Sequence, residues 1–130
     1  MMKNMEHELA MQIVGLVAVM IGLAMNADPV GFNQRIFGDV EGLDTGPSSA
    51  MRMAIGGGPM GIGSILLWCS FNVDDAASSE AILIGTAIGL GVFFSTVAGA
   101  KLRGYVDHFP VLPMVILPML IAICLYSAMS

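Results

Sequence analysis

Four long apolar segments constrain this chain more than any other feature of its sequence. They cover residues 9–25, 51–71, 81–100 and 111–129. None carries a charge in its interior, and Arg52 stands at the edge of the second. An α-helix rises about 1.5 Å per residue, so about 20 apolar residues cross a hydrocarbon core of about 30 Å. Because the apolar runs are continuous rather than alternating, helices are favoured over strands. We therefore predict an all-α, polytopic membrane protein, a four-transmembrane-helix bundle that forms one domain over residues 1–130.

The composition supports a lipid environment. Hydrophobic residues make up 56% of the chain and charged residues 12%, whereas soluble domains carry about 25% charged residues. The net charge of −5 argues against nucleic acid as a partner. Cys69 and Cys124 match no metal or redox spacing, which favours two small buried side chains. The first segment could instead be a signal peptide, but Lys3 alone precedes it against Glu6 and Glu8, so we favour a span.

The long polar connection over residues 26–50 has its own helical pattern. Asp28 followed by Pro29 predicts an N-cap and a first helical residue. We expect a short interfacial helix that ends near Gly38 and lays its apolar face on the membrane. Four apolar residues recur at helical spacing and would form that face: Phe32, Ile36, Val40 and Leu43.

The basic residues predict the orientation. Four of the five lie in or beside the first and third connections: Arg35, Arg52, Lys101 and Arg103. The positive-inside rule then places residues 26–50 and 101–110 in the cytoplasm. Both termini, and the turn that contains Asp74 and Asp75, would face the outside, which is the periplasm of a bacterial cell.

Glycine patterns predict how the helices pack. A G-x-x-x-G-x-G pattern occurs in the second and the third segments, at Gly57, Gly61 and Gly63 and at Gly85, Gly89 and Gly91. Lipid supplies no hydrophobic drive between helices, so small residues that permit close backbone contact mark the interfaces. We therefore predict a tight central hairpin of the second and third segments.

Arg52 and Pro59 are the first candidates for a functional role. A charge at membrane depth suggests a functional site, although an arginine at a helix end also reaches the phosphate layer at little cost. Pro59 lies inside the second segment and frees the carbonyl group of Ile55. Such a break can expose backbone groups to a substrate, but we favour a simple kink that the neighbouring helices accommodate.

The other polar candidates lie at the end of the third segment and after it. Lys101 and Arg103 complement the helix dipole and the inner leaflet, while Asp107 and His108 could form a pH-sensitive pair or a solvated loop. No ionisable residue lies in the middle of a span, which argues against a proton relay. We predict no catalytic residue, no metal site and no cofactor.

The sequence also resembles a known family. Asp28-Pro29 after the first segment and Ile36-Phe37-Gly38 in the connection are two of the shared motifs. Arg52 followed by Gly56-Gly57, and a glycine-rich third helix that leads to Asp107 and Pro110, are the others. The chain is similar to a bacterial family of small four-helix integral membrane proteins of unknown function, loosely DoxX-like. The resemblance implies the fold and no activity.

Three functions fit these observations. The first is a non-enzymatic accessory or assembly subunit, or a homo-oligomer, that acts by helix packing among membrane lipids. The second is a small-solute transporter or channel that uses Arg52 and Pro59. The third is a quinone- or lipid-binding protein, which requires an apolar cleft that opens to the bilayer and is lined by Trp68, Phe93 or Phe94.

Overall fold

The computed structural model describes residues 6–38, 41–42, 45–104 and 111–129. These residues form the helices α1 (His7–Ala27), α2 (Pro29–Phe37), α3 (Gly46–Asn72), α4 (Ala76–Leu102) and α5 (Val111–Ala128). Helices α1, α3 and α4 are long and apolar enough to cross a membrane, and α5 is a shorter apolar helix. The predicted all-α membrane class is confirmed, and each of the four apolar segments lies in a helix, except that α5 ends one residue before the fourth segment does.

Polar caps explain why α3 and α4 begin earlier than the apolar runs. The hydroxyl of Thr45 accepts a hydrogen bond from the backbone N–H of Ser48, which satisfies one free donor at the start of α3. Asp75 caps α4 in the same way, with 2.8 Å between its Oδ2 and the N–H of Ser78. Hydrogen bonds from the side chain and backbone of Ser78 hold the pKa of the Asp75 carboxyl below its ordinary value.

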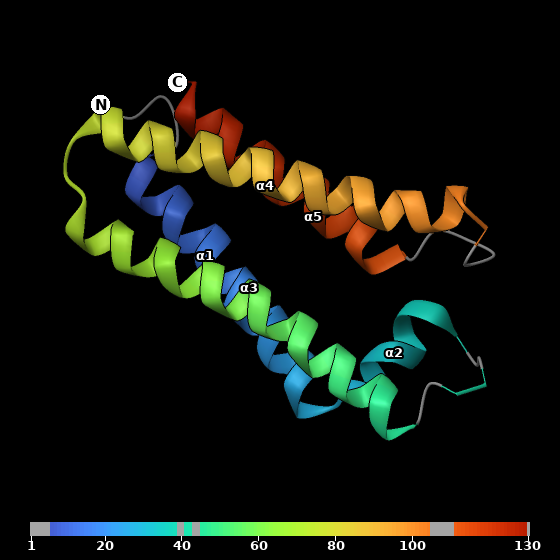
Figure 1. Ribbon diagram of the computed structural model, residues 1–130. Coiled ribbons are helices and arrows are strands. Elements are labelled where there is room, and N and C mark those ends of the chain that lie inside the picture. Colours follow the sequence, from blue (N-terminus) through green and yellow to red (C-terminus); the bar gives the residue numbers. More distant parts are fainter. Residues whose placement is uncertain (1–5, 39–40, 43–44, 105–110, 130) are drawn as a thin grey trace.

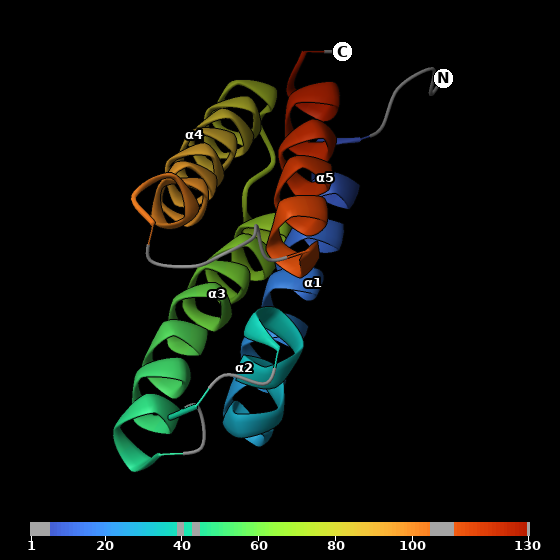
Figure 2. The same ribbon diagram turned by 90° about the vertical axis from the view of Figure 1, so that its right-hand side faces the viewer.

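The long helices form two antiparallel pairs, α1 with α3 and α4 with α5 (Figure 1). The pairs meet where α1 begins and α5 ends, which we call the closed end. They diverge toward the opposite end, the open end, where α2 lies beside α1 and α3 (Figure 2). Although α3 and α4 follow each other in the chain, they hardly touch beyond the turn that joins them.

Four glycines set the contact between α1 and α3. Gly15 faces Gly63, and Gly22 faces Gly56, so that backbone meets backbone at two points along the pair. A Cβ atom added at Gly63 would lie 2.5 Å from the carbonyl oxygen of Gly15, and one at Gly56 would lie 3.0 Å from that of Gly22. We call these four residues the glycine seam. Their spacing of seven along each helix is close to two turns, so both contacts fall on one face.

The predicted tight hairpin of α3 and α4 is therefore wrong. Of the six glycines assigned to it, only Gly63 makes a close helix contact, and its partner is α1. A Cβ atom at any of the other five would meet nothing within 4 Å: Gly57, Gly61, Gly85, Gly89 and Gly91. The physical reason is that α1 also carries glycines at the matching spacing of seven, so α3 makes its closest backbone contact there.

Two contacts join the helix pairs at the closed end. The imidazole of His7 on α1 shares a hydrogen bond with the hydroxyl of Ser127 on α5, at 3.0 Å between Nδ1 and Oγ. Its Nε2 lies 3.6 Å from a carboxylate oxygen of Glu80 on α4. Buried apolar side chains of α1, α3, α4 and α5, among them Met11, Leu83 and Cys124, fill this half of the bundle. Among the described residues, most of the contact between the pairs lies at this end, while Leu112 of α5 packs against the cluster of Met25, Phe32 and Ile36 at the other.

Helix α2 forms where the sequence predicts it, between the cap at Asp28 and Gly38, whose φ of 77° ends the helix. Its apolar face, however, does not point away from the protein. Phe32 and Ile36 are buried against Met25 of α1. The prediction that this face lies on the membrane is therefore wrong for these two residues, because α1 covers them. Val40 and Leu43, the rest of that predicted face, lie outside the described residues.

Candidate functional site

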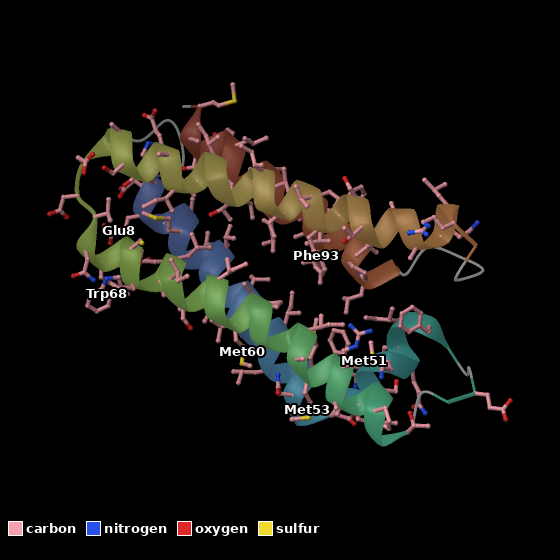
Figure 3. The ribbon with its side chains drawn as sticks, in the orientation of Figure 1. Glu8, Met51, Met53, Met60, Trp68 and Phe93 are labelled. Atoms are coloured by element: carbon pink, nitrogen blue, oxygen red, sulfur yellow. The ribbon has the colours of Figure 1, made fainter. Side chains whose placement is uncertain are left out.

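A cleft of about 780 Å³ lies between the two helix pairs, on the side where α3 and α4 diverge. Helices α3 and α4 form its two walls, while α1, α2 and α5 supply its floor and its open end. In Figure 3, Phe93 points from α4 into the space between the pairs, and Trp68 points away from it. Because α3 and α4 hardly touch, the cleft opens sideways between two helices that are long and apolar enough to face lipid.

The wall from α3 is one helical stripe. It consists of Arg52, Ile55, Gly58, Pro59 and Ile62, which recur at intervals of three or four residues. Pro59 lies in the wall without ending the helix, since α3 runs unbroken from Gly46 to Asn72.

Two glycines of α4 have a different role from the helix packing that the sequence predicts. Gly85 and Gly89 face the cleft and leave space there instead of holding a neighbouring helix.

Among the described residues that line the cleft, Arg52 is the one ionisable side chain. Its guanidinium carbon lies 5.5 Å from the centre of the Phe32 ring and 5.8 Å from that of Phe37, within cation–π range. Its Nε donates a hydrogen bond of 2.6 Å to the side-chain oxygen of Asn33. The side chain is therefore held at the cleft by α2, and it does not simply extend into water.

Asn33 connects α2 to α3. It is 2% exposed, and its amide nitrogen donates a hydrogen bond of 3.3 Å to the hydroxyl of Ser48. Its oxygen receives the bond from Arg52. Asn33 thus fixes both the docking of α2 and the direction of the guanidinium group. Sequence reasoning missed it, although Phe32, Asn33, Ile36 and Phe37 form one face of a helix by their spacing.

The structure places Arg52 and Pro59 on the same wall of the cleft. The transporter or channel hypothesis from the sequence uses these two residues. Lys101 and Arg103 lie at the end of α4 and do not line the cleft, although each makes contacts of its own. Asp107 and His108 lie outside the described residues. Of the three aromatic residues named for a lateral cleft, Phe93 lines it, whereas Trp68 is 69% exposed on the outer face and Phe94 is not part of the lining.

The chemistry of the cleft is that of an apolar slot with one cation. Thr86 is its other polar side chain, and its hydroxyl already donates to the carbonyl of Ile82 at 2.8 Å. A charged or strongly hydrated molecule would lose its water against such walls without replacement partners. The site suits a ligand that is mostly hydrocarbon and carries one polar or anionic group.

Comparisons of the chain with family models, curated proteins and solved structures find no match. The resemblance to a DoxX-like family therefore stays a prediction from its motifs.

Proposed function

We propose that this protein binds an apolar or amphipathic membrane molecule, a lipid or a quinone, in the cleft between its helix pairs. The observation that supports this most directly is the cleft of about 780 Å³ with its almost entirely apolar lining. Ligand sites typically have volumes of about 300–1,000 Å³ and apolar walls with a few placed polar groups. The lateral opening between α3 and α4 would let such a molecule enter from the bilayer.

In our proposal the open end lies at the cytoplasmic face. Basic residues favour the cytoplasmic side, and four of them lie near the helix ends at the open end: Arg35, Arg52, Lys101 and Arg103. Helix α5 would act as a fourth span, since it runs beside α4 along the bundle. The termini would then face the outside.

Native mass spectrometry of the purified protein tests the binding function. We expect one lipid or quinone to stay bound after most detergent has been removed, because the ligand is enclosed on both sides by helices. The ligand is then extracted, and its mass shows whether it is a lipid or a quinone. A chain that is recovered without any adduct, under conditions that keep it helical, would contradict the proposal.

A second candidate is the accessory subunit or homo-oligomer. Gly57 and Gly61 lie four residues apart on an exposed face of α3 with open space around them, which would let another helix approach. If this face binds a second copy, Gly61→Leu should convert the oligomer to a monomer in cross-linking of native membranes. A wild-type protein that is monomeric there would count against this candidate.

The transporter candidate draws support from one fact, that Arg52 and Pro59 share a wall of the cleft. The contacts of His7 with Ser127 and Glu80 join the two helix pairs at the closed end. Transport would require this end to open in turn, so we rank ligand binding ahead of transport.

A further inference from the structure

We infer that Arg52 is a head-group site, and that the molecule in the cleft is an anionic phospholipid whose phosphate binds the guanidinium group while an acyl chain lies along the α3 wall. This inference rests on the proposed binding function and adds the chemical class of the ligand.

The charge of Arg52 needs a partner that the described part of the chain does not supply. Across residues 6–38, 41–42, 45–104 and 111–129, no carboxylate lies within ion-pair distance of the guanidinium. Within the same residues its hydrogen bonding is limited to the Nε contact with Asn33. An arginine has five N–H donors in a planar fork, so the terminal amino groups keep donors available for a ligand.

The fork is held in place before any ligand arrives. Phe32 and Phe37 contact it by cation–π interactions, and Asn33 fixes Nε. These contacts reduce the side-chain freedom that binding would otherwise remove. Phosphate is the anion that this geometry suits best, because guanidinium groups bind its oxygens in pairs.

The wall beyond Arg52 fits a hydrocarbon chain. Ile55, Pro59 and Ile62 continue the stripe away from the open end, and ten residues of helix extend for about 15 Å. A neutral quinone would leave the cation without a counter-ion. The positive group of a zwitterionic lipid would find no acidic side chain among the described lining residues. A single negative charge on an acyl lipid matches both parts of the site.

Head-group competition tests the inference. Delipidated protein in a non-ionic detergent is mixed with equal amounts of phosphatidylglycerol and phosphatidylcholine that carry identical acyl chains, and bound lipids are counted by native mass spectrometry. We expect the wild type to prefer phosphatidylglycerol by about tenfold, the effect of one charge-assisted hydrogen bond. Arg52→Gln should bring the preference close to one while lipid still binds. Arg52→Lys should keep part of it, since the charge remains without the fork.

Arg35→Gln is the matched control. It removes the same charge from exposed α2 at the same end of the molecule without touching the cleft lining. We expect it to keep the full preference. Equal binding of the two lipids to the wild type would overturn the inference and leave the binding function standing. The inference would also be overturned if Arg52→Gln and Arg35→Gln lost the preference for phosphatidylglycerol to the same extent. A wild type that binds neither lipid would instead refute the proposed function itself. If circular dichroism shows that Arg52→Gln has lost its helices, the inference is tested on two other results. These are the ratio of bound phosphatidylglycerol to phosphatidylcholine in the wild type and the same ratio in Arg52→Lys.

Discussion

Replacing Gly63 with alanine should destabilise the protein by about 2 kcal/mol or more, although the change adds only one methyl group. The new Cβ atom would lie 2.5 Å from the carbonyl oxygen of Gly15 and 2.9 Å from the backbone nitrogen of Val19. Neither atom belongs to a flexible side chain, so the whole of α1 would have to move away. Loss of close contact at this point would also weaken the other half of the glycine seam, where Gly22 meets Gly56.

Gly61→Ala is the control for this prediction. Gly61 lies on the same helix, two residues away, and a Cβ atom there meets nothing within 4 Å. Alanine favours helices over glycine by about 1 kcal/mol, so this variant should be as stable as the wild type or slightly more stable. Helical signal followed during unfolding by sodium dodecyl sulfate in mixed micelles measures both variants. Equal stability of Gly63→Ala and Gly61→Ala would show that the glycine seam does not hold the helices together.

Replacing Gly89 with leucine should reduce the amount of bound lipid at least tenfold, a loss of about 1.4 kcal/mol. Gly89 lines the cleft and has open space around it, so a leucine side chain would occupy the volume that the ligand needs. The fold should persist, because leucine is a better helix former than glycine and meets no atom within 4 Å at its Cβ position.

Gly91→Leu separates this effect from a general change in α4. Gly91 belongs to the same helix and also has open space at the Cβ position, but it does not line the cleft. We expect it to retain as much lipid as the wild type in native mass spectrometry. If both leucine variants lose the lipid equally, the ligand does not depend on the cleft, and the site has been assigned wrongly.

The class of fold and the positions of the helices could be predicted from the sequence, because few backbone structures other than a helix are stable in lipid. An apolar run without charges must satisfy its backbone groups internally, and a helix does so. The helix ends were harder to predict, because the hydrogen bonds of Thr45 and Asp75 extend α3 and α4 into polar sequence that hydropathy alone assigns to loops.

The helix partners could not be predicted from glycine spacing alone. The G-x-x-x-G-x-G pattern draws attention to Gly57, Gly61 and Gly63, but the contact that forms uses Gly56 and Gly63, spaced by seven. Gly15 and Gly22 in the first segment repeat that spacing, so a search for matching intervals in two segments would have found the pair. Spacing identifies a face of a helix, while only the match between two faces identifies a partner.

The candidate site was predictable in part. Arg52 and Pro59 attract notice in the sequence because charge and proline are rare within apolar segments. What surrounds Arg52 depends on how α2 folds back onto α1 and α3, and a nine-residue helix carries little information about its own docking. The ring contacts and the bond to Asn33 therefore required the structure.

Photo-crosslinking of retained lipid tests the central claim most directly, namely that the cleft between the helix pairs holds a lipid chain. The protein is expressed in membranes that contain phosphatidylglycerol with a diazirine on its acyl chain, extracted, washed in detergent, and only then irradiated. Peptide mapping should find adducts on the cleft residues Ile62, Phe93 and Ile116. Trp68 and Ile88, which are exposed on the outside, should carry none. Adducts on those outer residues in place of the cleft, or no adducts after washing, would contradict the account.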